Sequence, residues 1–577
     1  MTRHVDPIVL ALTQNRLDHI CRHMGWVMSQ TALSPIFSEG HDFSCYITGR
    51  DGKIISQADG LPAHAAGGGF AIRALLKAFG DDIHEGDAFL MNDPYVAGGN
   101  HLPDWVMATP VFVGGRLVAF ACDRAHQSDI GGGAPGTYNG GATDIFQEGL
   151  RIPPVRVLEK GKVRPDLWSL ILLNTRTPDL MDGDLQAMIG ATHVGAERIV
   201  TLADELGHDG VADVFEAVLD HADVSFRKIV SELPDGVYVG DEHTDNDCFS
   251  PGKFNIHVTL TVKGDSITVD YTGTDKQMRG FKNSPIANSH SLTYVGLAAF
   301  LGGEIPINEG TFRCVNLVLP KGSLVNPDAP APQTMSTMYM GHEIIHAIWK
   351  ALAKADPARA CAGWAKVAHG ISAGKTAAGE SYVLYHWAAS PGAGAVAERD
   401  GFHSMGVIGS LGGLKLPNVE LYERLYPYRI LRHEIRMDSA GAGERRGGAG
   451  VEYVSEVDGD LIHSFRSEAL NYGSGFGING GKDGGLAQNS VESDGKLMTD
   501  APVYGLRNLR NARFTVSAAG GGGWGDPRRR DPALVVRDVK DGIISVEHAR
   551  RQYGVAVDAQ GALDSAATTI LRAAAAE

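Results

Sequence analysis

Three dense clusters of glycine in the last third of the chain limit its fold more than any other feature. They occupy residues 439–450 (SAGAGERRGGAG), 473–485 (GSGFGINGGKDGG) and 518–527 (AAGGGGWGDP). The 73 glycines among 577 residues follow no fixed period, which excludes a collagen-like triple helix. Because glycine has no Cβ atom, such clusters indicate many turns, tight loops and close approaches between backbones.

The spacing of apolar residues changes along the chain. In residues 7–33 apolar positions recur every three or four residues, which predicts a long helix with one apolar stripe. In residues 42–57 apolar and polar residues alternate around a Gly-Arg-Asp-Gly turn, which predicts a β-hairpin. The same two patterns predict strands at 87–91, 107–113, 117–123 and 254–274, helices within 167–231 and at 340–354, and a short strand, turn and helix over 535–555.

These segments predict an α+β, multi-domain protein. We expect an N-terminal region of mixed helix and sheet, followed by β-rich and glycine-rich domains. The expected boundaries give residues 1–235, 236–430 and 431–577 as the three parts. Hydrophobic residues at 43% and charged residues at 21% are ordinary for a globular protein, so large-scale disorder is not expected.

Charge and cysteine usage restrict the partners and the compartment. The net charge is −16 without a basic stripe, so the chain is not expected to bind nucleic acid or an anionic membrane surface. It has no run of 18 apolar residues, and its first 20 residues lack an apolar stretch that ends in a cleavage site, so neither a membrane span nor a secretory signal is expected. Six scattered cysteines without a CxxC pair suit a reducing cytoplasm and argue against a thiolate zinc site.

Candidate metal ligands are concentrated between residues 92 and 148. His101 and Asp104 form an HxxD pair, in which Pro103 stiffens the turn, and His126 follows at the end of the strand LVAFACD. Imidazole nitrogen with carboxylate oxygen suits Zn, Mn or Fe(II) and leaves positions open for water and substrate. Asp42 can supply a fourth ligand, with the adjacent His41 as a competitor.

The simpler interpretation is that these residues have structural roles. The chain has 22 histidines, so an HxxD match is expected by chance. His101 and His126 can satisfy buried carbonyls, and Asp104 can be a turn residue. The density of polar residues between turn-forming glycines favours a site, because such loops present side chains at one edge of a sheet.

Several longer segments resemble the hydantoinase B/oxoprolinase family. They are NDPYxxGGxHLPD, AHxxDIGG, EGLxIPP, NPDAPAP (326–332), RRGGAG (445–450) and GGGGWGDP (520–527), and they run in order over nearly the whole chain. The resemblance implies one divalent metal on His101, Asp104 and His126, and Asp42 matches the position of an additional acidic ligand. The family usually has Thr before the HLPD histidine, whereas this chain has Asn100, which can alter hydrogen bonding around the ligands.

The resemblance also implies a reaction and a partner. It implies the metal-bearing B subunit of an ATP-dependent cyclic amide hydrolase that opens a hydantoin, 5-oxoproline or lactam ring. An ATPase A subunit would use ATP to phosphorylate the substrate, and a metal-activated water would then attack it. This chain has no GxxxxGK[ST] loop, which fits ATP being handled by the partner. The resemblance further implies an α2β2 assembly in the cytoplasm.

Other residues near these motifs have two interpretations each. Asp129 and His64 are candidates for a general base or for contacts to a ligand, and Glu148 for orienting a ligand histidine; the alternative for each is a loop hydrogen bond. Arg445 and Arg446 can bind phosphate or lie in a solvated turn.

Two further functions compete with the hydrolase: a subunit of an acetone- or acetophenone-type ketone carboxylase, and a non-catalytic scaffold for the ATPase. The length favours the hydrolase.

Overall fold

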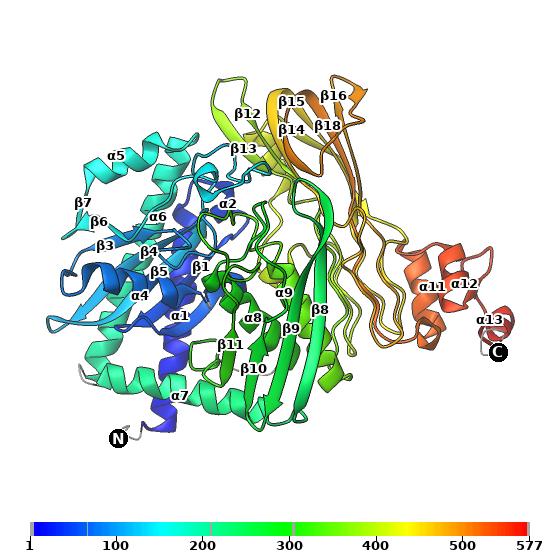
Figure 1. Cartoon of the computed structure of the whole chain (residues 1–577). Helices are drawn as coiled ribbons and strands as arrows, with labels where there is room; N and C mark the ends of the chain where they lie inside the picture. The colour runs from blue at the N-terminus through cyan, green and yellow to red at the C-terminus, as the bar shows by residue number, and fades with distance from the viewer. Residues whose placement is uncertain (1–4, 66, 208–209, 303–305, 574–577) are drawn as a thin grey trace. The chain divides into compact units, whose positions relative to one another are not determined.

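The computed structural model describes residues 5–65, 67–207, 210–302 and 306–573, and shows two compact units (Figure 1). Unit 1 comprises Met1–Ala351 and Gly409–Lys415, and unit 2 comprises Leu352–Ile408 and Leu416–Glu577. Both units mix helices with sheets, so the expected α+β, multi-domain class is confirmed. The division into 1–235, 236–430 and 431–577 remains a prediction.

A seven-stranded sheet forms the centre of the N-terminal part of unit 1. Its strand order is β2-β1-β5-β4-β3-β6-β7, so the hairpins β1–β2 and β4–β5 lie side by side. The strands are β1 (Phe43–Gly49), β2 (Ile54–Gly60), β3 (Ala88–Met91), β4 (Asp104–Val113), β5 (Arg116–His126), β6 (Val155–Glu159) and β7 (Lys162–Val163).

Helices cover both faces of this sheet. Along β4 and β5, odd-numbered side chains point to one face and even-numbered side chains to the other. Helices α1 (Pro7–Thr31) and α6 (Pro178–Leu206) pack on one face, where Thr109 donates a hydrogen bond to Thr192. Helix α4 (Gly68–Phe79) packs on the other face, against even-numbered residues such as Val106 and Cys122. Successive side chains of a strand point to opposite faces, so Asp104 and His126 lie on the α4 face.

Unit 1 also contains a second, four-stranded sheet of order β11-β10-β9-β8. Helix α9, which begins at Gly341, packs against this sheet so closely that a Cβ atom on Gly240 would lie 1.9 Å from the carbonyl oxygen of Ala347. The strands are β8 (Gly236–Asn246), β9 (Pro251–Lys263), β10 (Ser266–Asp270) and β11 (Val315–Val318). The remaining helices are α2 (Pro35–Ser38), α3 (Pro62–Ala65), the 3-10 turn η1 (Ile145–Gln147), α5 (Pro165–Leu173), α7 (Gly210–Val230), α8 (Ile286–Leu301) and α9 (Gly341–Ala355).

Unit 2 is built on a sheet of order β13-β12-β15-β18-β16-β17, with β14 also paired to β15. Long strands β15 and β18 hold its apolar core, which includes Tyr453 and Phe514. The elements are β12 (Ile371–Lys375), β13 (Ser381–Tyr385), α10 (Val419–Leu425), β14 (Tyr428–Ile435), β15 (Val451–Arg466), β16 (Gln488–Ser493), β17 (Lys496–Leu497), β18 (Tyr504–Ser517), η3 (Pro527–Arg529), α11 (Pro532–Lys540), α12 (Val546–Tyr553), β19 (Ala556–Val557), β20 (Leu563–Asp564) and α13 (Ser565–Ala573).

The three glycine clusters of unit 2 are extended segments that hydrogen bond to one another outside any sheet. The N–H of Gly521 donates to Gly448, the N–H of Gly448 donates to Ala393, and the N–H of Gly441 donates to Gly521. Side chains have no room between these backbones, because a Cβ atom on Gly521 would lie 2.0 Å from the carbonyl oxygen of Ala393. The clusters therefore form a backbone mesh, defined as the glycine-rich segments within 389–404, 439–450, 473–485 and 518–525.

One local expectation was wrong. The segment that starts at Val535 was expected to be a short strand, but it lies in helix α11. Asp531 caps this helix by accepting a hydrogen bond from the N–H of Ala533, and Pro532 occupies the first turn, where its missing N–H costs nothing. These start signals outweigh the strand preference of the two consecutive valines.

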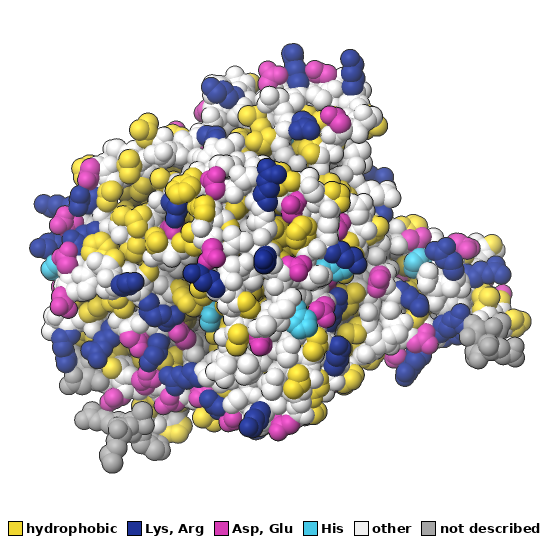
Figure 2. Space-filling model, viewed as in Figure 1, with side chains coloured by type: hydrophobic (Ala, Val, Ile, Leu, Met, Phe, Trp, Pro, Cys, Tyr) yellow, Lys and Arg dark blue, Asp and Glu magenta, His cyan; other side chains and the backbone are white. Residues whose placement is uncertain are grey.

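Two observations concern the surface and the helices. On the face shown in Figure 2, Lys and Arg side chains are interspersed with Asp and Glu, and apolar side chains are scattered among them. Among the described residues, no helix combines the length with the apolar character that a membrane span requires.

A Gly521→Ala variant tests whether the mesh excludes side chains. The added Cβ atom meets backbone rather than a movable side chain, so we expect a loss of stability of roughly 2–4 kcal/mol or a failure to fold. Gly473→Ala is the matched control, because its Cβ would make an ordinary 3.5 Å contact with Leu486. Thermal unfolding measures both, and equal midpoints for the two variants would contradict the mesh.

Asp184 gives a pH-dependent prediction. Its carboxylate accepts hydrogen bonds from the N–H groups of Leu33 and Ser34, and burial raises its pKa to about 6. Folded protein therefore holds an extra proton between about pH 4 and 6, and this contribution to stability falls as the pH rises, by at most about 1.4 kcal/mol per unit. Asp184→Asn lacks this loss, so its thermal midpoint relative to the parent should rise from pH 4 to 7. A constant difference would contradict the prediction.

Candidate metal centre

The register of the β4–β5 hairpin brings Asp104 and His126 together. The two strands turn at Gly114–Gly115 and pair antiparallel, so that Asp104 lies directly opposite His126 although 22 residues separate them. Both side chains point to the α4 face. A hairpin thus fixes two of the three predicted ligands by backbone hydrogen bonds alone.

The third predicted ligand, His101, lies on the loop that leads into β4. Asn92 holds this loop by donating hydrogen bonds from its side-chain amide to the carbonyls of Leu102 and Leu150. Gly99 allows the loop to fold tightly, since a Cβ atom there would lie 1.9 Å from the carbonyl oxygen of Asn92. Its conformation carries His101 back over the start of the strand.

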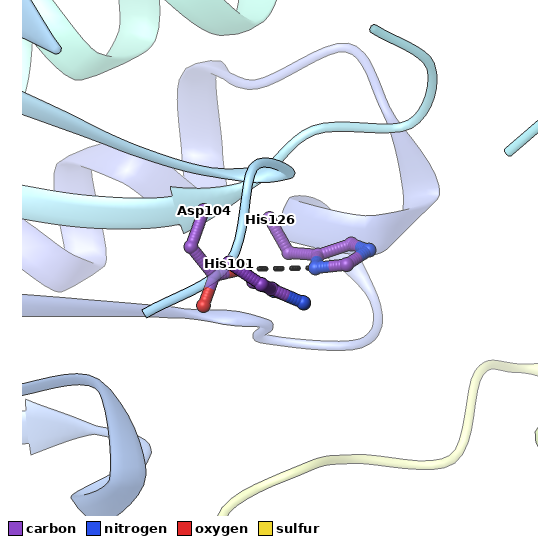
Figure 3. Close-up of side chains that lie close together, drawn as sticks. All are labelled: His101, Asp104 and His126. Atoms are coloured by element: carbon purple, nitrogen blue, oxygen red, sulfur yellow. Dashed lines mark hydrogen bonds and ion pairs between the residues drawn. The ribbon is translucent and has the colours of Figure 1, made fainter. Parts of the chain in front are cut away.

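The three side chains converge on one point (Figure 3). His101 Nε2 lies 2.7 Å and His126 Nδ1 lies 2.9 Å from the same atom, Asp104 Oδ1. One ligand atom from each residue lies within 4.8 Å of the others, and all three residues are buried. The predicted set His101, Asp104 and His126 is therefore brought together.

The protonation of His101 tests whether these residues fit a metal ion. Nδ1 of His101 lies 2.6 Å from the carbonyl oxygen of Thr334, so this nitrogen carries the proton. In a neutral ring the lone pair of Nε2 then faces the Asp104 carboxylate, and Nε2 has no hydrogen-bond partner among the described residues. A lone pair that faces a carboxylate at 2.7 Å is repelled by it, and either a second proton on Nε2 or a metal cation between the two atoms removes this repulsion. The residues fit a divalent cation.

The pKa shifts of His101 and Asp104 also indicate that this cluster favours positive charge beside the carboxylate. Burial acts to lower the pKa of His101, but the Asp104 carboxylate outweighs it and the pKa is raised. Burial acts to raise the pKa of Asp104, but the neighbouring histidines outweigh it and hold the pKa well below its ordinary value. Asp104 is thus an ionised carboxylate in a buried position, where a protonated histidine or a metal cation balances its charge.

Asn100 holds the second oxygen of Asp104. Its side-chain amide donates a hydrogen bond of 2.6 Å to Asp104 Oδ2, and its Oδ1 accepts one from the N–H of His101. A single residue therefore restrains two of the predicted ligands. Asn100, the residue that departs from the family pattern, therefore helps to hold His101 and Asp104 in place.

His64 and Asp42 lie at the edge of this cluster. His64 Nε2 is 3.2 Å from Asp104 Oδ2 and 3.7 Å from Asp42 Oδ1, and burial lowers the pKa of His64. Buried Arg124 fixes the His64 segment by donating a hydrogen bond to its carbonyl. Asp42 is not in the three-residue ligand group, and its role as a fourth ligand remains a prediction; the competitor His41 contacts Ser29 and Phe43.

Glu148 acts through the backbone that holds His101. Its carboxylate accepts hydrogen bonds from the N–H groups of Gln333 and Thr334, at 2.6–3.0 Å, and the carbonyl of Thr334 in turn fixes the His101 ring. Burial raises the pKa of Glu148 to about 7. This geometry suits the predicted role in orienting a ligand histidine.

Asp129 forms hydrogen bonds with the backbone of the loop that follows β5. Its carboxylate accepts hydrogen bonds from the N–H groups of Gly131, Gly136 and Arg176, and pairs with the Arg176 guanidinium at 3.1 Å. These contacts favour a role in holding the loop, and its use as a general base remains a prediction without support from them.

The structure also shows two contributors that the sequence did not single out. Tyr138 lies against both histidine rings, and its signal is one aromatic residue in the glycine-rich stretch GGGAPGTYNGG. Thr334 contributes a backbone carbonyl, for which the residue type gives no signal.

The two arginines considered as phosphate ligands lie in unit 2. Arg446 pairs with Asp400 and Asp538, and Arg445 donates a hydrogen bond to the carbonyl of Ala397, so these contacts of both arginines are within the protein.

Comparisons with known proteins place this chain in a family. The family model described as hydantoinase B/oxoprolinase matches residues 6–527. The chain belongs to the hydantoinase B/oxoprolinase family. Among family members, it is 34% identical to the beta chain of the caprolactamase of Pseudomonas jessenii, with 99% of both chains covered. The crystal structure of the ATP-dependent caprolactamase from Pseudomonas jessenii superposes with a TM-score of 0.89 at 32% identity, covering 99% of this chain and 100% of that one.

Two other relatives extend the range of this family. The putative D-/L-hydantoinase B chain of Pseudomonas sp. (strain NS671) is 28% identical, with 99% of this chain and 98% of the relative covered. The acetophenone carboxylase delta subunit of Aromatoleum aromaticum is also 28% identical, with 91% and 82% covered. The chain is therefore similar to relatives named for two different reactions.

A Glu148→Gln variant tests the backbone support of His101. The amide replaces one of the two acceptor oxygens with an N–H donor that opposes a backbone N–H group, so the segment Gln333–Thr334 and the carbonyl of Thr334 should shift. We expect Zn²⁺ or Co²⁺ to bind about 10–100-fold more weakly, measured by competition with a chromogenic chelator. Glu85→Gln, an exposed residue of the same unit, is the matched control. Unchanged affinity in Glu148→Gln would rule out the support.

Proposed function

We propose that this chain is the metal-bearing subunit of an ATP-dependent hydrolase of cyclic amides. The observation that carries the proposal is the convergence of His101, Asp104 and His126, whose nitrogens both lie against one buried carboxylate oxygen. Relatives named as a caprolactamase, a hydantoinase and a 5-oxoprolinase support the substrate class: a lactam, hydantoin or 5-oxoproline ring.

ATP is used by a second protein in this proposal. An unstrained ring amide is stabilised by resonance, and an ATPase subunit removes that stabilisation by phosphorylating the amide oxygen. The names of the relatives, which describe them as subunits, support such a partner, which we place with this chain in an α2β2 assembly in the cytoplasm. The net reaction converts a lactam or 5-oxoproline, ATP and two waters to an amino acid, ADP and phosphate, and a hydantoin gives the N-carbamoyl amino acid in the same way.

His101 Nε2, Asp104 Oδ1 and His126 Nδ1 would hold one divalent cation, either Zn or Mn/Fe, and Asp42 is the proposed additional ligand. A cation in this position supplies Lewis acidity and lowers the pKa of water. The chain contributes the order of the ligands. Thr334 sets the tautomer of His101 and Asn100 restrains Asp104, so both side chains are held in place by other groups of this chain.

His64 is the proposed proton acceptor. Burial lowers its pKa, so the ring is neutral at pH 7, and its Nδ1 has no hydrogen-bond partner among the described residues. A neutral imidazole can take the proton of an attacking water at one nitrogen while the other faces Asp104, 3.2 Å away. Asp129 stays in the proposal as the loop-holding carboxylate, and Glu148 as the positioning carboxylate.

The second candidate is a subunit of an ATP-dependent ketone carboxylase. The acetophenone carboxylase delta subunit supports it, because its identity to this chain equals that of the hydantoinase relative. Phosphate release by the chain together with its ATPase subunit separates the two candidates. Release with lactams or hydantoins supports hydrolysis, whereas release with acetone plus bicarbonate supports carboxylation.

A His126→Ala variant tests the metal and the reaction together. Purified parent protein should contain about one divalent metal per chain by elemental analysis, and the variant much less. Ring opening by the reconstituted pair should fall by at least about 100-fold, because a ligand to the cation is lost.

His84→Ala is the control for this variant, since His84 is an exposed histidine of the same unit. It should keep both the metal and the activity. Full ring-opening activity in His126→Ala would remove the proposed role of that residue, and a parent protein without metal would favour a scaffold.

A further inference from the structure

The loop after β5 has a strained conformation that its own sequence does not favour. Thr137 has a φ of 68°, a region that β-branched residues rarely adopt, and it is fully buried. Its hydroxyl has no hydrogen-bond partner among the described residues. Strain and an unpaired buried hydroxyl both cost free energy, and such costs concentrate at functional sites.

Asp129 and Arg176 maintain this conformation. The Asp129 carboxylate accepts the N–H groups of Gly131 and Gly136, which are 3.0 and 3.1 Å away, and Arg176 also donates to the carbonyl of Gly132. Residues 131–136, which lead directly into Thr137, are thus fastened at both ends to one buried carboxylate, which also pairs with Arg176. The loop cannot relax without breaking these bonds.

The strained loop places Tyr138 against the metal centre. The Tyr138 ring lies nearly parallel to the His126 ring, with 5.9 Å between centroids and 25° between planes. The same ring meets His101 edge-on, with 6.4 Å between centroids. Tyr138 is 4% exposed, so an aromatic ring covers both predicted histidine ligands on one side.

We propose that Tyr138 is a specificity-determining residue that closes one side of the metal centre and limits the size of the group that can approach the cation. This inference rests on the proposed function. A buried ring beside two ligands fills volume that a bulky substituent would need, and small differences in such a wall change selectivity by about tenfold or more. The expected substrates are therefore compact, unsubstituted ring amides rather than rings with bulky substituents.

The first test measures size selectivity without the ATPase subunit. Full-length protein is loaded with Co²⁺, and binding of imidazole and of 4-phenylimidazole is followed by the visible absorption of the cation. The parent should bind 4-phenylimidazole at least about tenfold more weakly than imidazole, because Tyr138 obstructs the phenyl group. Tyr138→Ala should reduce this ratio at least about tenfold, and Tyr138→Phe should keep it.

Two further variants make the test specific. Phe146→Ala removes an exposed ring from the same region, and it should leave the ratio unchanged. Tyr138→Leu replaces the ring with a smaller side chain, and it should give an intermediate ratio even if Tyr138→Ala does not fold. With the ATPase subunit added, Tyr138→Leu should shift kcat/KM from unsubstituted toward ring-substituted lactams.

The outcomes separate this inference from the proposed function. Co²⁺ binding with the same size ratio in Tyr138→Leu and parent overturns the inference and leaves the metal centre intact. A parent protein that does not bind Co²⁺ overturns both. A ratio that falls in Phe146→Ala as much as in Tyr138→Leu also overturns the inference, because the obstruction would then not be specific to Tyr138.

Discussion

One carboxylate oxygen, Asp104 Oδ1, lies between two imidazole nitrogens in a buried part of unit 1. A negative charge in this environment is costly unless it is compensated, because little water is available to solvate it. A protonated His101 ring or a metal cation can balance it, and the hydrogen bond from Nδ1 to Thr334 holds the ring in place in either case. The surrounding structure is best understood as a frame that keeps this oxygen, the two nitrogens and the space between them in place.

The frame is assembled from segments that are distant in sequence. The hairpin turn at Gly114–Gly115 sets Asp104 opposite His126, and Asn100 restrains the second carboxylate oxygen. Glu148 holds the backbone whose carbonyl orients His101. Each of these contacts uses a fixed backbone group or a short side chain, which limits movement of the donor atoms more than long flexible side chains would.

The ligands could be predicted from the sequence, but their surroundings could not. HxxD, the histidine at the end of a strand and the family resemblance together named His101, Asp104 and His126 as candidate ligands, and the structure brings these side chains together. The expected strands 107–113 and 117–123 lie within β4 and β5. The roles of Thr334 and of the Asp129 carboxylate depend on which segments meet, and no local spacing encodes this. The expected strand at Val535 failed because a capping aspartate and a proline decided the local structure.

The backbone mesh of unit 2 has a consequence for how this protein can diversify. Where two segments of the chain contact each other through their backbones, as at Gly448 and Gly521, there is no side chain whose substitution could adjust the packing between them. Ordinary hydrophobic cores can change in sequence when a large-to-small substitution is compensated by a small-to-large one. Such compensation is not possible at these backbone contacts. Inherited variation in unit 2 should therefore accumulate at its hairpins, such as β16–β17, as changes in length and in surface side chains.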